Sequence, residues 1–186
     1  MDACTGIIVN YANTPIELVE SEQPLRIERY GFIDDTGGAG RHRGGLSLER
    51  HFRFLEHEAV VQVRSDRRKI PPYGLQGGSN GARSMVRIRR ANGDLEEMPS
   101  KFLTTLKRND VIEIRLPSGG GFGDARMREP QAVLADVIDQ KMSIPHAAAN
   151  YGVAITSHPA TVDWPATERL RADSKRTELE YGAKNT

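Results

Sequence analysis

The strongest constraint on the fold is an alternation of apolar and polar residues that recurs in short runs. It is clearest over residues 46–54, where Leu46, Leu48, Phe52 and Phe54 share one parity and polar side chains take the other, with Arg50 the one misfit. A period of two residues is typical of a β-strand with one buried face. Similar patterns predict further strands over residues 25–33, 59–63, 84–90, 95–98 and 110–116.

Clusters of glycine separate these runs. Residues 34–45 contain five glycines, residues 70–81 contain four glycines and two prolines, and a Pro-Ser-Gly-Gly-Gly-Phe-Gly run ends at Gly123. None of them fits a phosphate-binding template, because the Walker lysine is missing and Arg43 stands where a dinucleotide fingerprint needs a third glycine. We therefore expect tight connections in which glycine serves chain geometry. The glycines singled out are Gly37, Gly38, Gly40, Gly119, Gly120, Gly121 and Gly123. The Asn92-Gly93 pair predicts a type I′ hairpin turn.

Helical periodicity appears at the two ends of the chain. Thr14, Pro15 and Glu17 form a helix-start signal, with Thr14 as the capping residue and Pro15 at the first helical position. Two short helices are expected near the C-terminus, one opening at Pro130 and one over residues 145–151. The fold class predicted is β-rich α+β: antiparallel strands with long Gly-rich loops, followed by two short C-terminal helices. Residues 1–155 are expected to form one domain and residues 156–186 an extended polar tail.

Several function classes are excluded by composition. No apolar run approaches the roughly 20 residues that span a bilayer, and the N-terminus has no secretory signal, which predicts a cytoplasmic protein without a membrane partner. Cys4 is the single cysteine, so neither an internal disulfide nor a multi-cysteine zinc site can form. The spacing of His42, His51 and His57 does not match a ligand set. We therefore expect no catalytic residue, no metal and no cofactor in this chain.

The charge is distributed unevenly although the net charge is only +1. Residues 41–90 hold 12 basic and 4 acidic residues, whereas residues 1–40 hold 2 basic and 7 acidic ones. One basic cluster lies between a predicted strand and a glycine loop and comprises Asp66, Arg67, Arg68, Lys69, Tyr73, Gly77 and Gly78. It could bind a small anion or dock onto an acidic partner, and the pattern favours docking. Nucleic acid is not an expected partner, because aromatic residues do not interleave with the arginines.

The order of the motifs resembles a known family. The segments NTP, ERY, GGAGRxRGG, SDRRxxPPxGLxGG and GGGFGD follow one another in this chain. Together they resemble the C-terminal part of the B subunits of the hydantoinase/5-oxoprolinase family, which includes the acetone and acetophenone carboxylases. The resemblance covers residues 13–155, most of the chain, and the linked motifs are more specific than any single glycine pattern.

The resemblance implies an ATP-dependent enzyme with several subunits. In such an enzyme an A-type subunit with an actin-like nucleotide-binding fold activates the substrate, and a B-type subunit completes cleavage of a cyclic amide or carboxylation of a ketone. The length of this chain then suggests a small subunit from a split B-type protein, with a larger B-type subunit and an A-type subunit as partners. ATP and Mg²⁺ are expected on the A-type partner, and a divalent metal is compatible with the larger B-type partner. The alternatives are a ketone-carboxylase subunit and a non-catalytic binding or regulatory protein.

Overall fold

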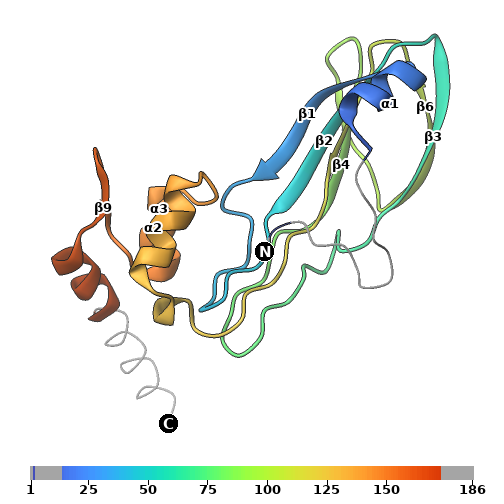
Figure 1. Ribbon diagram of the computed structural model, residues 1–186. Helices are drawn as coiled ribbons and strands as arrows, with labels where there is room; N and C mark the ends of the chain where they lie inside the picture. The colour runs from blue at the N-terminus through green and yellow to red at the C-terminus, as the bar shows by residue number, and fades with distance from the viewer. Residues whose placement is uncertain (1, 3–13, 173–186) are drawn as a thin grey trace.

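A computed structural model describes residue 2 and residues 14–172 of the protein (Figure 1). The predicted fold class is confirmed: most of the strands lie in antiparallel sheets, and two of the helices follow them near the C-terminus. Cys4 and the part of the predicted tail beyond residue 172 lie outside the described residues. The elements are α1 (Ile16–Glu22), β1 (Leu25–Ile33), β2 (Ser47–Phe54), β3 (Glu58–Arg64), β4 (Met85–Arg89), β5 (Leu95–Glu97), β6 (Lys101–Lys107), β7 (Val111–Arg115), a 3₁₀ turn (Ala125–Met127), α2 (Pro130–Ile138), α3 (Ile144–Tyr151), β8 (Ile155–Ser157) and β9 (Ala160–Val162).

The main sheet has five antiparallel strands in the order β1-β2-β7-β4-β5. Its apolar face carries one parity of each strand, as the sequence pattern predicts, and the paired strands β3 and β6 pack across part of that face. This β3–β6 ribbon and the sheet enclose one core, in which Val86, Ile88 and Ile112 are buried. Strand β6 was not predicted, because apolar Leu103 points outward and interrupts the alternation.

A β-bulge keeps the edge strand in phase with the apolar face. The register of β1 against β2 shifts between Ile27 and Arg29, so that Ile27 faces Phe52 while Tyr30 faces Arg50. An extra residue in one strand moves the following side chains to the opposite face. The bulge therefore explains the parity change in the sequence, where Leu25 and Ile27 are followed by Tyr30 and Phe32. Arg50 fits on this face because its guanidinium lies 4.3 Å from the centre of the Tyr30 ring.

The opposite face of the sheet is charged. Glu49 is only 4% exposed and pairs with Arg29, His51 and Arg115. Further along the same face, one carboxylate of Glu28 bridges two arginines of neighbouring strands. The sheet is thus amphipathic, with an apolar face against the ribbon and an ionic face away from it.

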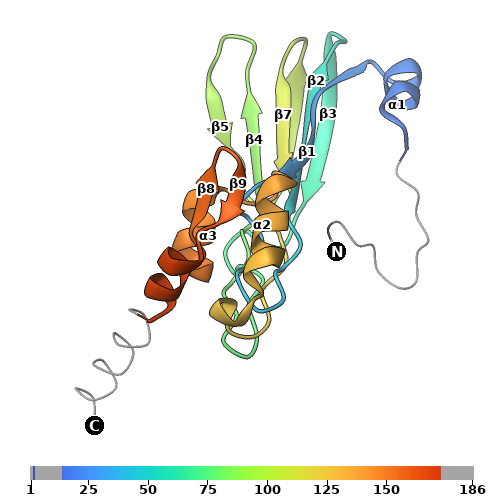
Figure 2. The same ribbon diagram turned by 60° about the vertical axis from the view of Figure 1, so that its left-hand side comes forward.

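A second, smaller core lies in the C-terminal region. Helices α2 and α3 pack with the β8–β9 hairpin, and Val133, Tyr151 and Val153 are fully buried there. Residues 164–172 are helical and follow the hairpin (Figure 2). The extended conformation predicted from residue 156 onward is therefore wrong for residues 156–172, whose short elements pack on α2 and α3. No helix in the described part of the chain is long and apolar enough to cross a membrane.

Two local predictions differ from the structure. Helix α1 begins one residue later than expected: Pro15 occupies the N-cap, and no side chain, Thr14 included, caps the helix. The Asn92-Gly93 hairpin forms, but only Gly93 has a positive φ, and its N–H donates to the Arg90 carbonyl. This is a type I turn followed by a left-handed glycine, the usual geometry of a slightly longer hairpin loop.

Candidate functional site: a glycine bundle and a basic turn

Three glycine-rich segments lie side by side at one end of the main sheet. Residues 37–45, 73–81 and 118–123 all extend from the same end of the strands, and we call them the glycine bundle (Figure 1). Backbone hydrogen bonds join all three segments. Gly38 N–H donates to the Gly119 carbonyl at 2.9 Å, Gly121 N–H to the Ser79 carbonyl at 2.9 Å, and Ser79 N–H to the Ala39 carbonyl at 2.7 Å.

Glycine is required in the bundle because the backbones approach too closely for side chains. A Cβ on Gly38 would lie 2.5 Å from the Gly121 nitrogen, and a Cβ on Gly40 would lie 2.6 Å from the Phe122 nitrogen. Each of the predicted glycines Gly37, Gly38, Gly40, Gly119, Gly120 and Gly121 would meet a backbone atom of the bundle at under 3.0 Å. Gly77 and Gly123 instead have left-handed φ angles of +87° and +74°. The sequence indicated that glycine serves geometry, but it gave no sign that the three segments pack against one another.

The bundle carries exposed apolar side chains on a rigid backbone. Tyr73, Leu75 and Phe122 are 65%, 55% and 48% exposed. Leu75 and Phe122 are joined by a β-bridge, and the His42 ring lies 6.2 Å from the Phe122 ring. Large aromatic and aliphatic groups held on a preorganised backbone are the usual anchors of protein interfaces. This surface of the bundle is therefore suited to docking against another protein.

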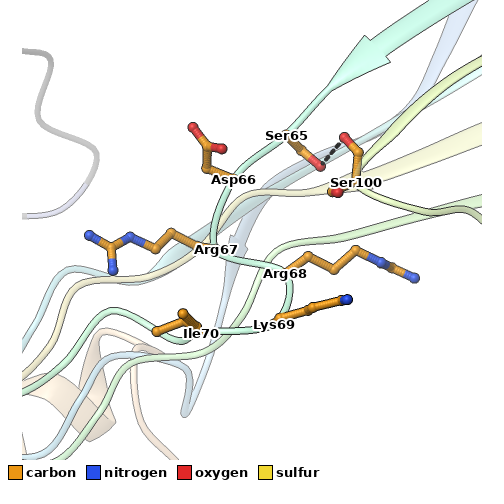
Figure 3. A pocket seen from close by; sticks show the side chains of 7 residues that line it. All are labelled: Ser65, Asp66, Arg67, Arg68, Lys69, Ile70 and Ser100. Atoms are coloured by element: carbon orange, nitrogen blue, oxygen red, sulfur yellow. Dashed lines mark hydrogen bonds between the residues drawn. The ribbon is translucent and has the colours of Figure 1, made fainter.

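The predicted basic cluster forms a turn between β3 and the bundle. We call residues 65–70 the basic turn; together with Ser100 they line an open cavity of about 450 Å³ (Figure 3). The turn is fixed from outside: Ser65 N–H donates to the Ser100 carbonyl at 2.8 Å, and Ser84 Oγ donates to the Asp66 carbonyl at 2.5 Å. Arg67 has a left-handed φ of +59°, which is unfavourable for a side chain of this size.

The predicted cations do not converge on one point. Figure 3 shows that Arg67 extends to one side of the turn, while Arg68 and Lys69 extend to the other. Arg68 forms an ion pair with Glu97 at 2.8 Å. A second cavity of about 540 Å³ is lined by Arg68 and Lys69 and also by Arg83 and Arg115.

Sequence reasoning missed the last two of these cations. Arg115 ends β7 and pairs in register with Met85, which begins β4. This pairing brings Arg115 to the Arg83 end of the strand, and only knowledge of the strand order could have indicated it.

A buried ionic network fastens the bundle to the helices. Arg43 pairs with Asp2 at 2.9 Å and with Asp136 of α2 at 3.3 Å, and Arg128 pairs with Asp136 at 2.8 Å. The hydrogen bond from Arg43 lowers the pKa of Asp2, with burial acting against it. Burial also raises the pKa of the Tyr151 hydroxyl, which lies within this core. These charges are satisfied by one another, so we assign them a structural role.

The described residues offer no group of three His, Cys, Asp or Glu side chains that could hold a metal ion. His51, one of the histidines considered from the sequence, lies 3.5 Å from a Glu49 carboxylate oxygen on the charged face of the sheet. The features that remain for function are thus the bundle surface and the two basic cavities.

The chain is similar to proteins that are much longer. A putative D-/L-hydantoinase of the B type from Pseudomonas sp. strain NS671 is 34% identical over 173 residues, which are 92% of this chain and 29% of that protein. The crystal structure of an ATP-dependent caprolactamase from Pseudomonas jessenii matches with a TM-score of 0.75 and 31% identity, over 85% of this chain and 28% of that one. An acetone carboxylase structure shares the fold, with a TM-score of 0.77 and 19% identity over 90% of this chain and 27% of that one.

The chain therefore spans less than a third of the length of these relatives. The family model described as Hydantoinase B/oxoprolinase matches residues 1–125. This match covers about two thirds of the chain, and the protein belongs to the hydantoinase B/oxoprolinase family.

Proposed function

We propose that this protein is a non-catalytic B-type component of an ATP-dependent enzyme that hydrolyses a cyclic amide. The observation that carries the proposal is the combination of family membership with the short span of the relatives that the chain covers. Among the described residues, the functional surfaces are apolar anchors and basic cavities, which suit association with other polypeptides. Its partners are a larger B-type polypeptide and a nucleotide-binding A-type subunit.

In this proposal the glycine bundle and the basic turn contact the partner subunits. Tyr73 and Phe122 supply apolar anchors, and Arg67 supplies a charge whose side chain forms no ion pair with another described residue. ATP and Mg²⁺ belong to the A-type subunit, and a divalent metal, where one is used, to the larger B-type subunit. The contribution of this chain is to position those subunits.

The test is the native mass of the complex recovered through a tag on this chain, with its partners identified by mass spectrometry. Recovery of two larger chains, one of them nucleotide-binding, supports the proposal. Recovery of this chain alone as a monodisperse monomer refutes it and favours a binding or regulatory protein. The double variant Arg67→Ala/Arg68→Ala should weaken assembly or turnover, and unchanged assembly and turnover would remove the basic turn from the interface.

A ketone-carboxylase subunit is the second candidate. It is supported by the acetone carboxylase likeness, which at 19% identity concerns the fold, whereas the caprolactamase likeness reaches 31% identity. The purified complex distinguishes the two reactions. ATP-dependent hydrolysis of a lactam, hydantoin or 5-oxoproline supports the amidase, and bicarbonate-dependent consumption of a ketone supports the carboxylase.

A further inference from the structure

The apolar face of the main sheet is larger than the ribbon that covers it. Beyond the β3–β6 ribbon, the exposed apolar side chains on this face are Phe32 of β1 and Leu116, which follows β7; they are 46% and 48% exposed. Phe32 faces Leu48 across the β1–β2 pair, so the two strands present one continuous apolar strip. The bulge in β1 keeps Phe32 on this face, where no described segment packs over it.

Two cavities along this strip form one groove. The smaller, of about 260 Å³, is lined by Leu48, Arg50, Phe52, Ile114 and Leu116. The larger, of about 620 Å³, shares Phe52 and Ile114 with it and continues toward α1 and β3. We call the two together the sheet groove. A contiguous apolar surface of this kind resembles a core from which a packing partner has been removed.

The rim of the groove is acidic at the end near α1. Glu56 and Glu58 line the larger cavity, and α1, whose last residues lead into Gln23 and Pro24 of the same lining, carries Glu17 and Glu22. None of these four carboxylates forms an ion pair with another described residue. At the far end of the groove the charge is reversed, because Arg50 lies there against Tyr30. A ligand for this groove should therefore be apolar along its length and basic at the α1 end.

We propose that the sheet groove binds an apolar segment of the larger B-type polypeptide, with a Lys or Arg at the end that lies between α1 and β3. This inference rests on the proposed function and specifies the surface and the chemistry of one of its contacts. Two observations select this occupant. The same fold makes up only 28% of the caprolactamase chain, so most of such a protein lies outside the region present here. The acidic rim also requires a basic complement, which a purely apolar segment could not provide.

The contact can be located by photo-crosslinking in the complex recovered for the proposed function. A benzoylphenylalanine is placed at position 32 or 116, and a control is placed at position 103, where Leu103 is 68% exposed on the outer side of the ribbon. We expect positions 32 and 116 to crosslink to one apolar segment of the larger B-type chain, with a basic residue within a few positions. Crosslinks only to the A-type subunit or to a second copy of this chain, or none from positions 32 and 116, would overturn the proposal.

Affinity provides an independent readout. Leu116→Asp should weaken binding of the larger B-type chain at least tenfold, whereas Leu103→Asp should change it less than twofold. Both side chains are about half exposed or more, so urea unfolding should show that both variants fold. Glu56→Lys/Glu58→Lys should weaken binding at low salt, and the loss should shrink as salt screens the rim.

The outcomes separate the two proposals. Unchanged affinity of the Leu116→Asp variant refutes the groove contact and leaves the proposed function standing, because the complex still forms. Recovery of the chain alone refutes both proposals. A homodimer that Leu116→Asp dissociates would assign the groove to a second copy and overturn the inference.

Discussion

Substitution of Gly44 by alanine tests whether the glycine bundle is held together by direct backbone packing. Gly44 is buried, and a Cβ there would lie 2.5 Å from the Gly119 carbonyl carbon and 2.9 Å from the Gly120 carbonyl oxygen, with the Gly119 oxygen closer still. These are backbone atoms that cannot rotate away. Overpacking of a core costs about 1–3 kcal/mol, and three such contacts place Gly44→Ala near 3 kcal/mol, at about the upper end of that range.

The matched control is Gly31→Ala in β1. A Cβ on Gly31 would meet nothing within 4 Å, and its φ is not in the left-handed region. Alanine there restricts the unfolded chain and should stabilise the protein by about 0.4–1 kcal/mol. Urea unfolding followed by far-ultraviolet circular dichroism gives both free energies, and the Gly44→Ala melting temperature should fall by about 6–12 °C. If the two variants unfold within about 0.5 kcal/mol of each other, the packing argument is refuted.

Three further predictions concern single sites. Burial raises the pKa of Asp110, but hydrogen bonds from two backbone amides and Arg90 outweigh it and hold the pKa below the ordinary 3.8. Its stabilising contribution is present above pH 3.8 and is lost as the pH falls through the lower folded-state pKa. Asp110→Asn should therefore lower stability at pH 7 and flatten its acid dependence between pH 5 and about 2, as measured by urea unfolding; an unchanged slope contradicts this. Arg67→Gly should raise the free energy of unfolding by up to about 1 kcal/mol by relieving the left-handed φ, and a loss of stability in the same assay would show that Arg67 is not strained. Tyr73→Ala/Phe122→Ala should leave stability nearly unchanged, because both side chains are about half exposed or more, yet weaken recovery of partner subunits; full recovery would remove the bundle surface from the interface.

The local elements of the sheet could be predicted from sequence because their signals are local. The alternation in β1 and β2 predicts both strands to within one residue, and even the parity change after Arg29 corresponds to the bulge. Strand β6 could not be predicted, because its place depends on pairing with β3 about 40 residues earlier, which imposes the register Val61 to Thr104 on an irregular pattern. The same holds for β8 and β9, which are three residues long and depend on packing against α2 and α3.

The candidate site could be predicted by residue but not by arrangement. The basic turn and the glycines are visible in the sequence, and the resemblance to the family rests on those same segments. Their geometry is not visible, because the left-handed φ of Arg67 sends neighbouring cations to opposite sides of the turn. Arg83 and Arg115 join Arg68 only through the order of β4 and β7 in the sheet. Such non-local pairings are set by the whole fold.

The glycine bundle also has a consequence for the order of folding. Its hydrogen bonds join residues about 40 and 80 positions apart, as between Ala39 and Ser79 and between Gly38 and Gly119. Closing such long loops is entropically costly, and contacts between distant residues form slowly. During synthesis the first two segments leave the ribosome without the third, so the bundle cannot close until residue 123 has emerged. The helices fastened to it through Arg43 and Asp136 then dock last. The sheet is thus available to early partners before its glycine-rich end is complete.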